Sequence, residues 1–144
     1  SAESQDDELW WRPRAPVDYG GRPARPADAP LAEARLDSPW TEERILVERA
    51  RLLRRLGRFA DAALAWEAIG AGAGPLSPHA WIEVAKLREH RLGDMAGALE
   101  AAGRARQIAD RRSRLGRFDP ALERALAARL DRLMRRLRPA IARA

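Results

Sequence analysis

A segment of about ten residues occurs twice in this chain, and it limits the possible folds more than any other feature. The first copy reads Arg-Leu-Gly-Arg-Phe-Ala-Asp-Ala-Ala-Leu over residues 55–64, and the second reads Arg-Leu-Gly-Asp-Met-Ala-Gly-Ala-Leu over residues 91–99, an offset of 36 residues. In both copies a glycine ends one helical run and small residues open the next. A period in the thirties predicts stacked helical hairpins.

Helical periodicity extends over most of the chain after residue 40. Apolar residues recur there at three- and four-residue steps, and no stretch alternates as a strand would. Three pairs, at residues 38–39, 77–78 and 119–120, place a capping Ser or Asp before a proline that suits the first helical turn. The sequence therefore predicts an all-α fold with helices over residues 40–56, 60–69, 78–92, 95–113 and 119–138.

Residues 43–110 carry large, small, glycine, bulky and small residues in turn at matched positions, namely Leu46 and Trp81, Ala50 and Ala85, Gly57 and Gly93, Phe59 and Met95, and Ala62 and Ala98. In this pattern they resemble the tetratricopeptide repeat (TPR) family. The chain departs from the family pattern at Arg49 and Ile69, and by one extra residue before Gly93. The resemblance implies two antiparallel hairpins whose small residues allow close helix packing, and a function in binding other proteins.

The predicted last helix follows a third Leu-Gly-Arg-Phe turn at residues 115–118, too close to Gly93 to complete another hairpin. On a helical wheel its apolar residues fall within an arc of about 120°; they are Leu122, Leu126, Leu130, Leu133, Met134, Leu137 and Ile141. We expect this helix to cap the stack, because a short array of hairpins must cover its last apolar face.

The first 37 residues have a different composition. Six prolines fall within the first forty residues, which excludes a regular helix there, and the same stretch carries Trp10, Trp11, Tyr19 and Trp40. Disordered segments are usually poor in aromatic residues, so we expect residues 1–37 to form an extended Pro-rich strap along a helical domain of residues 38–144. A free linker is the alternative. Because the first residue is Ser, we also expect the chain to be part of a longer protein.

Several chemistries are excluded or disfavoured by composition. The absence of Cys rules out disulfides and thiolate nucleophiles and fits a cytoplasmic location. No apolar stretch reaches the roughly 18 residues of a membrane span, so no membrane partner is expected. His79 and His90 would lie about 16 Å apart on one helix, too far to share a metal. No phosphate-binding loop motif is present, and we expect neither enzymatic activity nor a cofactor.

The expected binding surface is the inner face of the first helix of each hairpin, where TPR-like modules usually bind. Cations there flank two aliphatic residues; the positions are Arg44, Val47, Arg51, Arg55, His79, Ile82, Lys86 and His90. Such a groove would suit a protein segment or acidic peptide, with arginines pairing its carboxylates. The alternative is a solvated face whose arginines pair locally with Glu48 and Glu89.

Charge suggests a second possible function. Residues 104–144 carry 13 basic and 4 acidic side chains, a balance of +9 in a chain of net charge +6. Residues 85–94, together with Trp66 and the basic last helix, also resemble the helical region that follows the catalytic domain in some bacterial ribonuclease-H-like (YprB-type) exonuclease proteins.

The leading prediction is therefore a non-catalytic protein-interaction or scaffold module. The alternative is an accessory module that contacts nucleic acid, and could assist an upstream nuclease domain, through Arg124, Arg129, Arg132, Arg135 and Arg136.

Overall fold

The computed structural model describes residues 39–142, and side-chain burial for residues 41–138. It contains α2 (Pro39–Arg55), α3 (Phe59–Gly70), α4 (Ser77–His90), α5 (Met95–Arg114) and α6 (Pro120–Ala142). No strand occurs over residues 39–142, which confirms the predicted all-α class. Each bound lies within two residues of its prediction, except that α6 continues to Ala142. The strap predicted for residues 1–37, with Trp10, Trp11 and Tyr19, lies outside the described residues.

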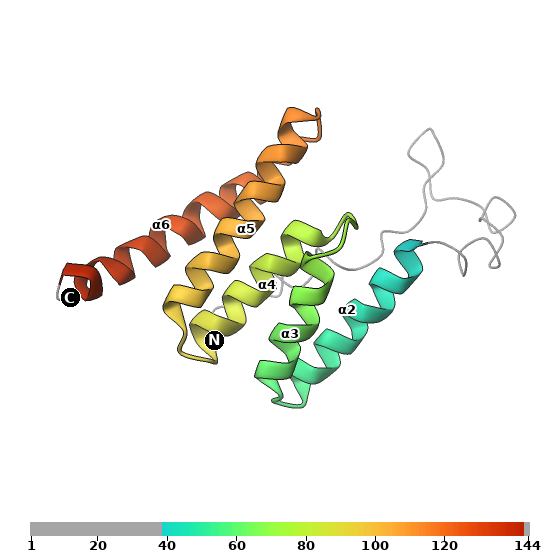
Figure 1. Ribbon diagram of the computed structural model, residues 1–144, viewed down its shortest axis with the longest axis horizontal. Coiled ribbons are helices and arrows are strands. Elements are labelled where there is room, and N and C mark those ends of the chain that lie inside the picture. The colour runs from blue at the N-terminus through green and yellow to red at the C-terminus, as the bar shows by residue number, and fades with distance from the viewer. Residues whose placement is uncertain (1–38, 143–144) are drawn as a thin grey trace, which may run out of the picture. The chain divides into compact units, whose positions relative to one another are not determined.

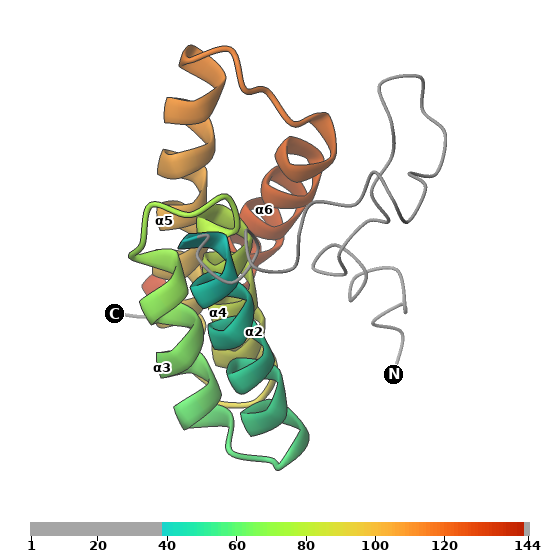
Figure 2. The same cartoon turned by 90° about the vertical axis from the view of Figure 1, so that its right-hand side faces the viewer.

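Residues 42–144 form one compact unit, which holds the helical hairpins. Each helix there runs back along its predecessor, so α2 with α3 and α4 with α5 form two hairpins (Figures 1 and 2). Helix α4 packs against both α3 and α5, and α6 packs against α5. Within this unit α2 and α6 therefore lie at opposite ends of the row of helices (Figure 1).

Three turns share one backbone conformation. Gly57, Gly93 and Gly116 have φ values of 75°, 63° and 81°, a region that residues with a Cβ rarely adopt. The residue after each of these glycines closes the helix end by a backbone hydrogen bond, from Arg58 N to Leu53 O at 2.9 Å, from Asp94 N to Arg88 O at 2.8 Å and from Arg117 N to Arg112 O at 2.8 Å. The turns predicted at these glycines are confirmed.

The packing of small residues agrees with the spacing argument. Ala50, Ala62 and Ala98 are all 0% exposed, so the helix backbones approach closely at these points. Two tryptophans fill the larger spaces: Trp66 is 2% exposed and Trp81 is 7% exposed. A Cβ on Gly70 would lie 2.6 Å from Trp81 Nε1, so only glycine allows this contact at the end of α3.

The large position matched to the TPR pattern in the first helix is not a core position. Leu46 occupies it and is 38% exposed, whereas Val47 is 3% exposed. The buried residues Glu43, Val47 and Ala50 are spaced four and three residues apart and define the inward face of α2. Glu43 belongs to this face because its Oε1 accepts a hydrogen bond from Leu76 N at 2.9 Å, which ties α2 to the α3–α4 loop.

Helix starts follow the capping prediction only in part. Asp119 caps α6 as expected, since its Oδ1 accepts a hydrogen bond from Leu122 N at 3.1 Å. Ser77 does not cap α4: it is the first helical residue, and its hydroxyl donates to Gly70 O at 2.6 Å. The Ser77 hydroxyl binds this carbonyl and does not cap α4, because the carbonyl is buried at the end of α3 and needs a hydrogen-bond partner. The predicted cap at Ser38 lies outside the described residues.

Candidate functional site

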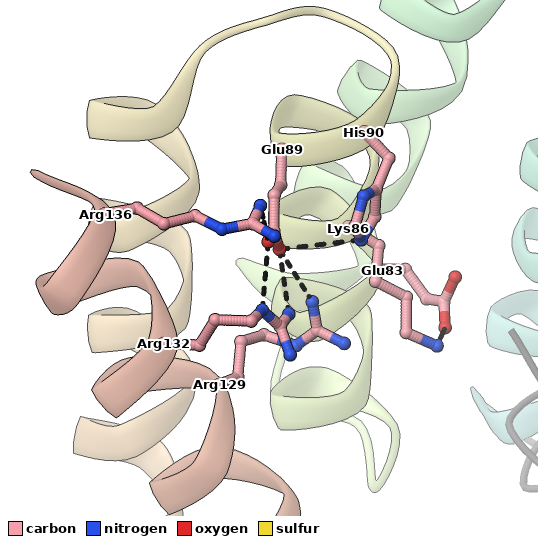
Figure 3. A network of polar contacts seen from close by, with 7 residues as sticks. All are labelled: Glu83, Lys86, Glu89, His90, Arg129, Arg132 and Arg136. Atoms are coloured by element: carbon pink, nitrogen blue, oxygen red, sulfur yellow. Dashed lines mark hydrogen bonds and ion pairs between the residues drawn. The ribbon is translucent and has the colours of Figure 1, made fainter. Parts of the chain in front are cut away.

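A cluster of charged side chains joins α4 to α6. The side chain of Glu89 is 0% exposed, and three arginines of α6 point at its carboxylate (Figure 3). Arg129 Nη1 lies 3.1 Å from Oε2, and Arg136 Nη1 lies 3.0 Å from Oε1. Arg132 binds both oxygens, from Nε to Oε1 at 3.1 Å and from Nη2 to Oε2 at 3.0 Å. We name Glu89, Arg129, Arg132 and Arg136 the Glu89 cluster.

The cluster is compatible with a buried, ionised carboxylate. Burial by itself would raise the pKa of Glu89, but the hydrogen bond from Arg132 and the charges of Arg132, His90 and Arg129 lower it below its ordinary value. His90 Nε2 lies 3.6 Å from Glu89 Oε2 on the same helix. The carboxylate therefore works as a structural anchor for α6 rather than as a group free to exchange protons near neutral pH.

Three of the five arginines predicted to contact nucleic acid belong to this cluster. Arg129 has a side chain only 12% exposed, while the side chains of Arg132 and Arg136 are 38% and 53% exposed. Arg135 is exposed and pairs with Asp131 one turn away, at 2.6 Å. Arg124 is exposed as well. Of the five arginines predicted to contact nucleic acid, three therefore bind Glu89 within the fold, and two, Arg124 and Arg135, face solvent without binding it.

The residues of the predicted peptide groove are also divided. Arg44 and Arg55 are exposed, and Arg51 lies 3.5 Å from Glu48, the local pairing that was the alternative. Val47 and Ile82, expected as the apolar contacts, are 3% and 9% exposed and count among the buried residues.

The remaining groove residues lie on α4, where His79 and Lys86 are half-buried and His90 is exposed. Lys86 Nζ lies 3.1 Å from Glu83 Oε1, on the side of α4 away from α6 (Figure 3). His79 is half-buried, and burial lowers its pKa below the ordinary value, opposed by the charge of Asp119 and assisted by that of Arg112. His90 lies at the far end of the helix, so the two histidines are not brought together.

The central role of Glu89 was missed, although a signal exists in the sequence. Ile82, Ala85 and Glu89 follow the three-and-four spacing of one helix face, and all three are buried. Arg129, Arg132 and Arg136 follow the same spacing on α6. An acidic residue on an apolar face, matched by a basic row on another helix, indicates a buried ionic contact.

A surface that the sequence analysis did not single out lies on the outer side of α2. Ile45, Leu52 and Leu56 are 64%, 48% and 63% exposed. At 3.6 residues per turn they fall within an arc of about 40°, opposite the buried face formed by Glu43, Val47 and Ala50. Arg49, also exposed, lies about 20° beyond this arc, and Leu56 directly follows the last residue of α2. We name Ile45, Arg49, Leu52 and Leu56 the α2 outer stripe.

Among residues 39–142, no group of three or more histidine, aspartate or glutamate side chains could hold a metal ion. No helix within those residues is long and apolar enough to cross a membrane.

Neither a protein-family model, nor a curated protein, nor a solved structure shows significant similarity to this chain.

Proposed function

We propose that this chain is a protein-interaction module of helical hairpins and that its α2 outer stripe binds an acidic amphipathic helix of a partner protein. One observation carries the proposal: three large aliphatic side chains, 48–64% exposed, lie in a row on the face of α2 opposite its buried side. Aliphatic side chains at this spacing match the seam by which two helices pack.

The sign of the partner's charge is inferred from the residues around the stripe. Arg49 lies within it, and Arg44 and Arg55 are exposed beside it, against the exposed carboxylates of Glu42 and Glu48. The exposed balance is therefore three positive charges against two negative ones. An acidic helix would pair its carboxylates with these arginines while its leucines cover the stripe.

The proposed partner, an acidic protein segment, is of the predicted type, but the proposed contact surface differs from the predicted groove. Val47 is replaced as the apolar contact by the exposed residues Ile45, Leu52 and Leu56, because Val47 is only 3% exposed. The predicted cations Arg44 and Arg55 remain part of it. A TPR-like module without catalysis remains the proposed class, supported by the paired hairpins and the buried alanines at their crossings.

The alternative, nucleic-acid contact through α6, has weaker support. Arg129, Arg132 and Arg136 are engaged by the buried carboxylate of Glu89, so their charge is partly neutralised within the fold. Arg124 and Arg135, which are exposed and do not bind Glu89, are the arginines on which that alternative rests.

A synthetic helix tests the proposal. The probe is a fluorescent peptide of about three heptads with leucine at the seam and glutamate on its flanks, compared with the same peptide carrying lysine on its flanks. At about 150 mM salt, the acidic peptide should bind at least about tenfold more tightly. Changing Leu52→Ser and Leu56→Ser together should abolish binding, whereas Met134→Ser, at a 52% exposed residue of α6, should not.

Three results would overturn the proposal. The first is equal binding of both peptides, and the second is binding that survives the double change on α2. The third is concentration-dependent dimerisation that the same double change removes, because a second copy of the chain would then be the occupant of the stripe. Tight oligonucleotide binding at the same salt, lost on changing Arg124→Glu and Arg135→Glu, would instead establish the alternative function.

A further inference from the structure

A pocket lies between the α3–α4 loop, the start of α4 and the second half of α5. Its volume is about 720 Å³, which is within the range of small-molecule sites. Gly70 at the end of α3 and residues 71–73 of the loop form one side, and Ser77 and Trp81 of α4 line it as well. The other side consists of residues of α5 and the turn that follows it, with Ile108 and Leu115 as apolar contacts.

The lining of this pocket is strongly basic. Arg104, Arg111, Arg112 and Arg117 all line it, and no aspartate or glutamate of the described residues does. We name these four residues and the space between them the arginine pocket. It involves neither the α2 outer stripe nor the Glu89 cluster, and it stands independently of the proposed function.

Nearby carboxylates neutralise little of the positive charge of these four guanidinium groups. Arg112 donates to two neutral acceptors of the loop, Gly74 O at 2.7 Å and Pro75 O at 2.8 Å. Arg104 lies 4.9 Å above the Trp81 ring, and its ion pair with Glu100, at 3.3 Å, joins two side chains that are each more than half exposed. Within the described part of the chain, Arg111 and Arg117 form no ion pair with a carboxylate.

Mutual repulsion between these groups would favour an anion among them. Burial lowers the pKa of Arg112, and the charge of Arg117 lowers it further, opposed by the charge of Glu43. A bound anion would relieve this repulsion and would gain charge-assisted hydrogen bonds from several arginines at once.

The spacing of the arginines points to a ligand with more than one anionic group. Arg104 and Arg111 are seven residues apart on α5, which separates their Cα atoms by about 10 Å along the helix axis. Arg111, Arg112 and Arg117 gather at one end, whereas Arg104 lies beside Trp81 at the other. A chain of phosphate groups spans this separation, whereas a single phosphate meets both ends only if the arginine side chains extend toward each other.

We propose that the arginine pocket binds a small molecule that carries a chain of phosphate groups. Inorganic tripolyphosphate is the probe, with orthophosphate as the short comparison, and both are titrated into the full chain by calorimetry at about 150 mM salt. Tripolyphosphate should bind at least about tenfold more tightly than orthophosphate, because it reaches both ends of the pocket. The indole N–H resonance of Trp81 should shift on addition of tripolyphosphate.

Matched variants separate the pocket from general attraction to a basic protein. Changing Arg111→Gln and Arg117→Gln together should weaken tripolyphosphate binding at least about tenfold. Changing Arg114→Gln and Arg124→Gln together removes the same two charges from exposed positions outside the pocket, and should weaken binding less than about twofold. Arg104→Gln should weaken binding of tripolyphosphate but not of orthophosphate.

The proposal is overturned if the two double variants weaken binding equally, since the attraction would then depend on net charge. It is also overturned if tripolyphosphate does not bind the unchanged chain at this salt concentration, or if orthophosphate binds as tightly. All four substituted positions in the double variants lie outside the buried core, so urea unfolding should give the same stability for both variants and verify that each is folded.

Discussion

Arg132 of α6 binds Glu89 of α4 at both carboxylate oxygens, with distances of 3.1 Å and 3.0 Å, although 43 residues separate them in the sequence. Arg129 and Arg136, on neighbouring turns of α6, share the same carboxylate. Because the row follows the helical repeat, sliding α6 by one residue would rotate all three guanidinium groups away from Glu89. The cluster therefore sets the register of α6 against α4.

Replacing Glu89→Gln should destabilise the fold by about 2 kcal/mol. The amide keeps the shape of the side chain but removes the negative charge shared by three arginines, of which Arg129 is the least exposed. Urea unfolding monitored by circular dichroism would measure the loss. Arg135→Gln, which breaks an exposed pair with Asp131, should lower stability by less than about 0.5 kcal/mol. Equal losses of stability in Glu89→Gln and Arg135→Gln would show that burial of the Glu89 carboxylate does not strengthen its ion pairs.

Enlarging a buried alanine should be harmful at the helix crossings. Ala62→Leu or Ala98→Leu should cost about 1–3 kcal/mol, because both positions are 0% exposed and the added atoms must push helices apart. Thermal or urea unfolding would measure this cost. Ala60→Leu, at an exposed position of α3, is the control and should leave stability within about 0.5 kcal/mol. Unchanged stability in both buried variants would refute close packing at these crossings.

Alanine should have opposite effects at two glycines near or within α5. Gly93→Ala should lower stability by about 1 kcal/mol, since a φ of 63° is unfavourable for a residue with a Cβ. Gly103→Ala should raise stability by about 0.5–1 kcal/mol, because that glycine lies inside α5 and a Cβ there would meet nothing within 4 Å. Chemical unfolding of both variants would compare them directly. A destabilised Gly103→Ala would mean that close packing there had been overlooked.

Acid should weaken the fold in two stages. The pKa of His79 is lowered in the folded chain, chiefly by burial, so the unfolded chain takes up a proton first as the pH falls below 6.5. Stability is then lost below that pH and is fully present above it. The lowered pKa of Glu89 adds a second loss below 4.5, where the unfolded carboxyl protonates first.

Free energies of unfolding measured from about pH 7.5 to about pH 3.5 would reveal both stages, the range being about one unit beyond each reference value. His79→Gln should flatten the first stage, and Glu89→Gln should flatten the second. The slope with pH, rather than the absolute stability, decides the result, so a general loss of stability in either variant does not obscure it. A first stage that persists unchanged in His79→Gln would assign it to another group.

The sequence by itself determined the features that depend on residues close together in the chain. Helix periodicity, the turns at Gly57 and Gly93, and the Asp119 cap each require only a few neighbouring residues, so local conformational preferences were enough to predict them. The small residues Ala62 and Ala98 could be placed at crossings because the repeated segment carries the packing pattern within it.

Tertiary structure alone decided which surfaces stay open and which charges meet. Val47 and Leu46 are adjacent and both aliphatic, and only the placement of α2 against its neighbours makes the first 3% and the second 38% exposed. The hydroxyl of Ser77 turned to Gly70 O because that carbonyl became buried. The arginines of α6 met Glu89 across 40 or more residues, a distance over which local rules carry no information. Burial and long-range electrostatic contacts depend on how the helices pack against one another, so only the tertiary structure determines them.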